Sequence, residues 1–166
     1  TLPGAGISCF ACSEANMEYM CKLIGIQAIS FDKMNQLRHV KFLQNKEHTL
    51  ALMKEHAKIL KPKFEMVVST LEREIAPLGI ATWHKPKGGY FVSVNTTPGL
   101  AKRTLALCKE AGVVMTSAGA TYPYGHDPAD SNIRVAPSLP PVEELEQAMA
   151  VFCCCLKLAA LEKSKK

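Results

Sequence analysis

Apolar residues recur every three or four positions over a long stretch of this chain, a pattern that predicts an amphipathic helix. The stretch begins at Asn45 and is ended by Pro77 and Gly79. Pro62 lies inside it, and because a proline ring clashes with the preceding turn, we expect a kink or a break there. The stripe comprises Leu50, Met53, Ala57, Leu60, Phe64, Val67, Leu71 and Ile75.

Two shorter helices are predicted before this stripe. Ser13 is a suitable N-cap for a helix that runs to about Ile24, with Gly25 as its stop. Ser30 and Asp32 are residues that open helices, so a second helix is expected after them.

Beyond Gly79 the apolar period shortens to two, which predicts strands at residues 80–83, 90–94, 113–116 and 132–136. Between the second and third of these, Thr97 as N-cap and Pro98 at the first helical position open a helix that ends at Ala111. A last helix follows Pro141. Its core-facing residues are expected to be Leu145, Met149, Phe152 and Leu156.

From Asn45 onward the predicted elements follow the order α-β-β-α-β-β-α. This order predicts an α/β fold class, and more narrowly an α+β two-layer small domain, in which helices cover a small mixed or antiparallel sheet. The long helix is expected to bridge this domain to another one. No internal repeat or low-complexity segment is visible.

The composition changes this picture little. The 166 residues are 48% hydrophobic and 21% charged, which is ordinary for a globular protein. The net charge of +5 is spread out without a basic stripe, so no nucleic-acid partner is expected. No apolar run approaches the roughly 20 residues of a membrane span, so no membrane partner is expected either. Because the chain opens on Thr1 and not on Met, we expect it to be a piece of a longer protein.

The seven cysteines, in a chain without a secretory signal, indicate a reducing compartment and a cytoplasmic location. The pair Cys9 and Cys12 has no second pair at zinc spacing, and no histidine motif of a metalloenzyme is present, so no metal site is predicted. The run from Cys153 to Cys155 lies in a helical stretch, where small core residues are the better interpretation.

The strand at residues 132–136 carries the most informative side chain, Arg134. Alternation puts Ile133 and Val135 on one face and Asn132, Arg134 and Ala136 on the other. A guanidinium cannot be buried without a partner, and its planar fork of donors suits a carboxylate held by two parallel hydrogen bonds. One interpretation is therefore an arginine that faces a cleft and binds an acidic ligand.

Two structural interpretations of Arg134 stay open. It is either an exposed arginine on an edge strand or the partner of Asp130 or Glu143. The first residues hold a second candidate feature, because Gly4, Ala5 and Gly6 let the backbone approach a ligand closely. Their amides are suited to a phosphate, although a short glycine-rich turn is a weak signal.

Several motifs occur together in an order that is more specific than any one of them. They are Pro86-x-Gly88-Gly89-Tyr90-Phe91, then Ala111-Gly112-Val113, then Gly119, then Asn132-Ile133-Arg134-Val135-Ala136 before a Glu-rich helix. This order resembles the C-terminal portion of class I/II aminotransferases, which are pyridoxal-phosphate enzymes of fold type I. The opening Thr1-Leu2-Pro3-Gly4-Ala5-Gly6 resembles the segment after the Schiff-base lysine in a MocR-like, aspartate-type bacterial subgroup.

The resemblance implies a domain organisation, a reaction and a set of partners. Residues 1–44 would end the large cofactor domain, and residues 45–166 would form the connecting helix and the C-terminal small domain. The complete enzyme would use pyridoxal 5'-phosphate to transfer an amino group between an amino acid and a 2-oxo acid, as part of amino acid metabolism. It would be a homodimer.

The resemblance also implies roles for single residues. Arg134 would bind the α-carboxylate of the substrate. The substrate cleft would further be lined by Asn132, Gly89, Tyr90 and Phe91. The cofactor phosphate would lie near Gly4, Ala5 and Gly6.

Two departures from the family pattern limit these implications. The Schiff-base lysine should directly precede Thr1 and is absent, so no catalytic residue is predicted within the chain. The phosphate-binding arginine expected near Gly6 is also absent. The fragment alone is therefore expected to be inactive. The alternative is a small non-catalytic α+β module with an amino-acid-binding or regulatory role.

Overall fold

The computed structural model describes residues 5–165. The chain forms two compact units, and their boundary along the sequence falls between Ala57 and Lys58. The first unit contains α1 (Glu14–Gln27), α2 (Lys33–Leu43) and the start of α3 (Lys46–Glu74). The second unit contains the rest of α3 and all of the sheet. The predicted boundary between a cofactor domain and a small domain concerns the complete protein and stays a prediction.

The first two helices begin where they were expected and one ends later. Ser13 precedes α1, and the side chain of Asp32 caps α2 by accepting a hydrogen bond of 2.9 Å from the Asn35 N–H. The predicted stop at Gly25 is wrong, because α1 continues to Gln27. A glycine inside a helix costs only about 1 kcal/mol relative to alanine, which weakens a helix without ending it.

The long helix α3 continues through Pro62, so of the predicted kink or break the break is wrong and the kink stays a prediction. A proline inside a helix costs about 3 kcal/mol through one lost hydrogen bond and a steric clash. The turns that follow offset this cost, because they carry Val67, Leu71 and Ile75 into the core, where each is fully buried. The 3₁₀ helix η1 (Ala76–Leu78) and Gly79, which has a left-handed backbone, then end the helical region.

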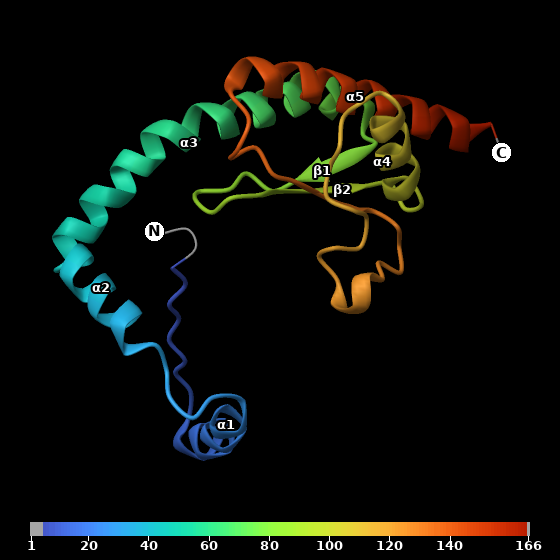
Figure 1. The fold of residues 1–166 in the computed structure, drawn as a ribbon. Helices are drawn as coiled ribbons and strands as arrows, with labels where there is room; N and C mark the ends of the chain where they lie inside the picture. Colours follow the sequence, from blue (N-terminus) through green and yellow to red (C-terminus); the bar gives the residue numbers. More distant parts are fainter. Residues whose placement is uncertain (1–4, 166) are drawn as a thin grey trace. The chain divides into compact units, whose positions relative to one another are not determined.

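A three-stranded antiparallel sheet forms one layer of the second unit. Its strands lie in the order β1 (Ala81–Trp83), β2 (Val92–Thr96), β3 (Asn132–Val135). The second layer consists of the end of α3, α4 (Ala101–Glu110) and α5 (Val142–Ser164), which lie on one side of the sheet (Figure 1). This arrangement confirms the predicted two-layer α+β fold.

The predicted strand at residues 113–116 is wrong, because this segment is irregular. Its alternation is real: Val113 and Met115 pack against the core, whereas Val114 is exposed. Alternation alone does not make a strand, since a strand also needs a neighbour to which its backbone can bond. Within the described part of the chain no strand pairs with this segment.

The start of α4 also differs from the prediction, because the helix begins at Ala101 and Thr97 does not cap it. The hydroxyl of Thr97 instead donates to the Ile80 carbonyl. The cap comes from Asp130, which is distant in sequence: its carboxylate accepts from the Lys102 N–H at 3.0 Å and its carbonyl accepts from the Ala101 N–H. These bonds satisfy amides that a helix start leaves unpaired.

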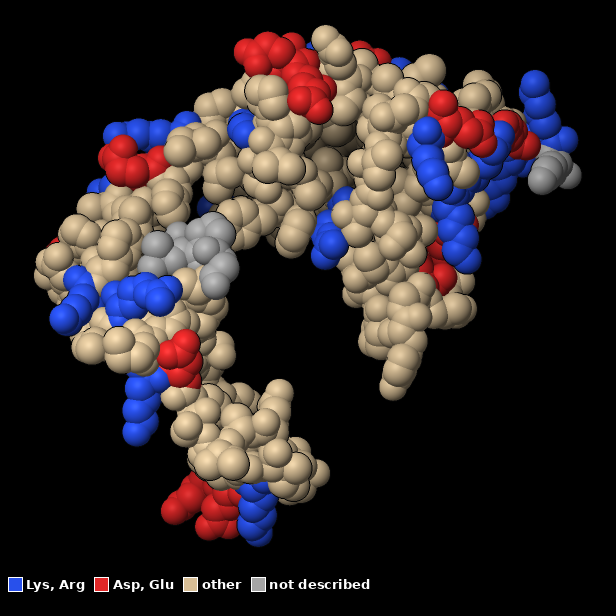
Figure 2. Space-filling model, in the orientation of Figure 1, with Lys and Arg blue, Asp and Glu red and all other residues tan. Residues whose placement is uncertain are grey.

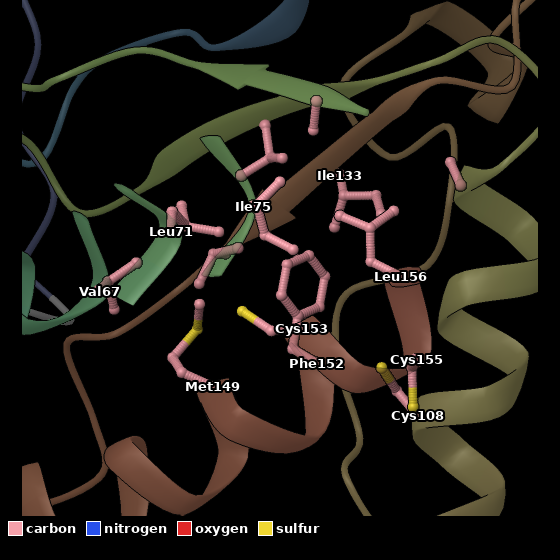
Figure 3. Close-up of a cluster of buried hydrophobic side chains, with 14 of the residues drawn as sticks. Val67, Leu71, Ile75, Cys108, Ile133, Met149, Phe152, Cys153, Cys155 and Leu156 are labelled. Atoms are coloured by element: carbon pink, nitrogen blue, oxygen red, sulfur yellow. The ribbon is translucent and has the colours of Figure 1, made fainter. Parts of the chain in front are cut away.

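The core lies between the helices and the apolar face of the sheet (Figure 3). Leu145, Met149, Phe152 and Leu156 of α5 are all buried in it, as predicted. The bidentate pair of Arg103 with Glu162 joins α4 to α5, with N···O distances of 2.6 and 2.8 Å.

The cysteine run on α5 is only partly in the core, because Cys154 is exposed whereas its two neighbours are buried. Figure 3 shows Cys155 next to Cys108 of α4. Burial raises the pKa of the Cys108 thiol to about 12, and the Cys155 thiol adds to this shift. Burial also raises the pKa of Cys153 to about 11. The two groups are therefore protonated packing residues at neutral pH.

Charged residues of both signs are distributed over the visible surface of the molecule (Figure 2). Among residues 5–165, no helix combines the length and the apolar character that crossing a lipid bilayer requires.

Candidate functional site

The second face of the sheet is polar, and it brings together side chains from β2 and β3. Arg134 is directly opposite Ser93, and Asn132 is directly opposite Asn95. Because side chains alternate along a strand, these four share one face, whereas Val92, Val94, Ile133 and Val135 form the opposite face against the core. We call Ser93, Asn95, Asn132 and Arg134 the polar face.

Arg134 is half-buried on this face, and β3, which carries it, is an edge strand of the described sheet. Its Nε is buried and has no hydrogen-bond partner. Its guanidinium carbon lies 4.5 Å from the centroid of the Phe91 ring. Within residues 5–165 it forms no ion pair, and the carboxylate of Asp130 is used to cap α4. The guanidinium is thus in contact with Phe91 and is not neutralised by an acidic side chain within residues 5–165.

Asn132 anchors the polar face through its side-chain amide. Its Nδ2 donates to Asn95 Oδ1 at 2.7 Å and to Ser93 Oγ at 3.0 Å. Its Oδ1 accepts from the Thr121 hydroxyl at 2.7 Å. Because both ends of its side-chain amide are hydrogen-bonded, Asn132 links the two strands to the loop before β3.

Asp127 fixes the entry of the chain into β3. Its buried carboxylate accepts the backbone N–H groups of Asn132 and Ser131 at 2.8 Å, and that of Ala129 at 3.0 Å. These bonds, with the one from Asn132 as the largest contribution, lower the pKa of Asp127 below its usual value of 3.8. The charged carboxylate therefore holds the segment that positions Asn132 and Arg134.

We expect Asp127→Asn to loosen this segment. The amide would present an NH₂ to backbone N–H groups where the carboxylate presents an oxygen, which leaves donors unpaired. Hydrogen exchange of the Ser131 and Asn132 amides in the complete protein should accelerate at least about tenfold. Glu143→Gln, an exposed change in the first turn of α5, is the control and should leave these rates unchanged.

The same carboxylate predicts a pH dependence with a defined sign. Because the folded-state pKa is lowered, the stabilisation is complete above the unfolded value of 3.8 and is lost as the pH falls through the lower folded value. Protection of the same amides should therefore decline in acid in the wild type, and should change less with pH in Asp127→Asn. Equal pH profiles would contradict this role.

The predicted glycine-aromatic segment lies directly before β2. Gly89 has a φ of +91°, a backbone conformation that favours glycine, and Tyr90 and Phe91 after it are exposed. The predicted strand began at Tyr90, whereas β2 begins at Val92 and extends to Thr96. Phe91 is brought against Arg134, as described above. For Tyr90 and Gly89 no contact with the polar face is observed among the described residues.

In the loop before β3, the backbone at Gly119 lies close to the backbone at Gly125. Gly119 has a φ of +82°, and a Cβ added there would collide with the carbonyl of Gly125. The tip of the loop contains the 3₁₀ helix η2 (Pro123–Gly125), in which Tyr124 is fully exposed and has a positive φ.

The predicted phosphate-binding residues belong to the first unit. Gly4 lies outside the described residues. Gly6 is exposed, a Cβ added to it would meet nothing within 4 Å, and its carbonyl accepts a hydrogen bond of 2.9 Å from Asn35 Nδ2. The backbone at Gly6 is thus open to a ligand, whereas Ala5 is half-buried. Residues 1–21 contain no lysine, arginine or histidine, so the charge that holds a phosphate must come from another segment.

A pyridoxal phosphate therefore fits this chain only in part. The open backbone at Gly6 is compatible with its phosphate. The lysine and arginine that would bind it covalently and electrostatically are not supplied by this segment. The polar face, by contrast, carries a planar cation that pairs with no acidic side chain within residues 5–165, and such a cation suits a carboxylate.

Two residues of the polar face, Ser93 and Asn95, were not predicted from the sequence. Ser93 and Asn95 alternate with Val92 and Val94, so a period of two placed over residues 92–96 would have identified them. Thr121 and Asp127 carry no such signal, since their partners are set by the path of the loop.

Comparisons with known proteins add to this picture. The whole chain, residues 1–166, matches the model of the aspartate amino-transferase family. It is 46% identical over 162 residues to the aspartate aminotransferase of Corynebacterium glutamicum, which covers 98% of this chain and 38% of that protein. It also superposes on the structure of a protein assigned as an aminotransferase from Corynebacterium diphtheriae, with a TM-score of 0.81 and 45% identity over 92% of this chain and 38% of that one.

A more distant solved structure shares the fold. It is the α-aminoadipate aminotransferase of Thermus thermophilus in complex with N-(5'-phosphopyridoxyl)-L-leucine, with a TM-score of 0.69 at 17% identity. This chain spans about 38% of the length of the curated relatives it matches. Because the match to the family model extends over residues 1–166, membership in the family does not depend on a single motif. The chain belongs to the aspartate aminotransferase family.

Proposed function

We propose that this chain is the C-terminal portion of a pyridoxal-phosphate-dependent aminotransferase that transfers an amino group between an amino acid and a 2-oxo acid. The observation that carries the proposal is Arg134, a held guanidinium with an unpartnered, buried Nε on the polar face of the sheet. Both substrates of such a reaction contain the carboxylate that this fork suits. The family match supports the type of reaction.

In this proposal the residues of the chain bind and orient the substrate. Arg134 donates two parallel hydrogen bonds to the α-carboxylate, which lies in the guanidinium plane, and so fixes the direction of the bond between Cα and its hydrogen. Asn132, joined to Ser93 and Asn95, keeps the strand pair that carries Arg134 in place. The cofactor, when bound, supplies the electron sink that stabilises a carbanion at Cα.

The remaining partners are part of the same proposal. The open backbone at Gly6 supports the proposal that this residue lies near the cofactor phosphate together with Gly4 and Ala5. Asn132, Gly89, Tyr90 and Phe91 are proposed to line the substrate cleft with Arg134. By analogy with the family, we propose a cytoplasmic homodimer that acts in amino acid metabolism.

The proposal is tested on the complete product of the native gene. The protein is incubated with pyridoxal phosphate and reduced with borohydride, and its intact mass and lysine peptides are measured. We expect a product heavier than 18.1 kDa that gains one reduced cofactor on one lysine outside residues 1–166, and amino transfer from L-aspartate to 2-oxoglutarate. Failure to take up the cofactor, combined with calorimetric binding of an amino acid, would instead support a non-catalytic binding module.

A further inference from the structure

The Phe91 ring lies against the guanidinium of Arg134, with 4.5 Å between the ring centroid and Cζ. The strand register explains why they meet. Arg134 is opposite Ser93, and Phe91 precedes Ser93 by two residues, so it lies on the same face and diagonal to Arg134. Diagonal neighbours of this kind are within reach of aromatic and long side chains.

Within residues 5–165, burial of apolar surface does not account for the position of Phe91. The residue is 47% exposed, and it is not among the described residues that form or pack against the core. A ring held at a cation but half in water is typical of an attraction between the cation and the negative face of the ring. The partner that explains the placement of Phe91 is therefore Arg134.

The Phe91 ring has its face toward the guanidinium carbon of Arg134. A carboxylate, by contrast, binds in the guanidinium plane through its N–H groups. In the proposed arrangement the ring and the carboxylate therefore use different sides of the guanidinium. A stacked ring also restricts rotation of the long side chain, which lowers the entropy lost when a ligand binds. Phenylalanine carries no hydroxyl that would compete for these donors.

We propose that Phe91 is a positioning residue that holds Arg134 ready for the substrate carboxylate. The inference rests on the proposed function, in which Arg134 binds that carboxylate. It assigns to Phe91 an action through Arg134 and not a contact with the reacting atoms. The inference predicts that removal of the Phe91 ring weakens carboxylate binding only when residue 134 is an arginine.

The test is a double-mutant cycle in the complete enzyme. Phe91→Leu keeps an apolar side chain but removes the ring, and Phe91→Trp keeps an aromatic face. Each is combined with Arg134 and with Arg134→Lys. The measurements are the dissociation constant of succinate, an unreactive dicarboxylate, and KM and kcat for L-aspartate. Leu158→Ala, a truncation of a similarly half-exposed apolar residue on α5, is the control.

We expect Phe91→Leu to weaken succinate about threefold to tenfold and to raise KM by a similar factor, with a smaller change in kcat. Phe91→Trp should lose less affinity than Phe91→Leu, and the control should stay within about twofold. In the Arg134→Lys background Phe91→Leu should add less than about twofold. If Phe91→Leu does not fold, Phe91→Met serves in its place.

The outcomes separate the two levels of the argument. If Arg134→Lys lowers affinity but Phe91→Leu does not, the positioning role is wrong and the proposed function stands. If Phe91→Leu costs as much with lysine at position 134 as with arginine, Phe91 acts independently of Arg134 and the inference is overturned. If Arg134→Lys itself changes nothing, the proposed function fails first.

Discussion

Replacing Arg134 by lysine in the complete enzyme should lower kcat/KM for the amino-acid substrate by about 30-fold to 150-fold, with part of the loss in KM. A lysine keeps the positive charge but is a point donor, so it cannot make two parallel hydrogen bonds to a carboxylate. Losing one charge-assisted bond of this kind costs about 2–3 kcal/mol. Turnover should also fall, because a substrate held at one point is less well oriented.

The control for this prediction is Arg103→Lys. Arg103 also makes a bidentate pair, with Glu162, but it joins α4 to α5 on the surface of the helix layer. Its replacement should leave kcat/KM within about twofold, since pairs of this exposure contribute little. Steady-state kinetics with L-aspartate and 2-oxoglutarate measure both variants. An unchanged kcat/KM in Arg134→Lys would remove Arg134 from substrate binding.

The largest loss of stability is expected for Phe152→Ala. Phe152 is fully buried and points from α5 into the core between the helices and the sheet (Figure 3). Truncating such a ring costs about 3–5 kcal/mol, because its transfer energy is lost and a cavity remains. Val94 of β2 and Ile133 of β3 belong to the same core. Phe152→Ala should therefore also destabilise the two strands that carry the polar face.

Native-state hydrogen exchange in the complete protein measures this effect within the second unit. The slowest amides of β2 and β3 should exchange about 100-fold faster or more in Phe152→Ala, if they open with the unit. Leu158→Ala, a half-exposed position on the same helix, should change these rates by less than about tenfold. Equal effects of both truncations would mean that Phe152 does not join the two layers.

The parts of the structure that could be predicted are those that local pattern specifies. The core side of α5 follows from the spacing of Leu145, Met149, Phe152 and Leu156, because a helix presents every third or fourth residue to one face. Arg134 could be singled out for a related reason, since a charge among β-branched residues on a strand requires an explanation.

The parts that could not be predicted depend on partners distant in sequence. The start of α4 is set by Asp130, which lies 28 residues after Lys102 along the chain. The segment at residues 113–116 has the pattern of a strand but finds no neighbour to bond to among the described residues. Asp127 is an ordinary loop aspartate in the sequence, and only the path of the loop turns three amides toward it.

The loop before β3 has a fixed base and a free tip. At the base, Gly119 is closed against Gly125, and Asp127 and Asp130 tie the loop to β3 and to α4. At the tip, Tyr124 contributes its whole side chain to the surface. A substitution at the tip is therefore expected to disturb neither the start of α4 nor β3. Surface loops of this kind tolerate changes of sequence better than the elements that they connect.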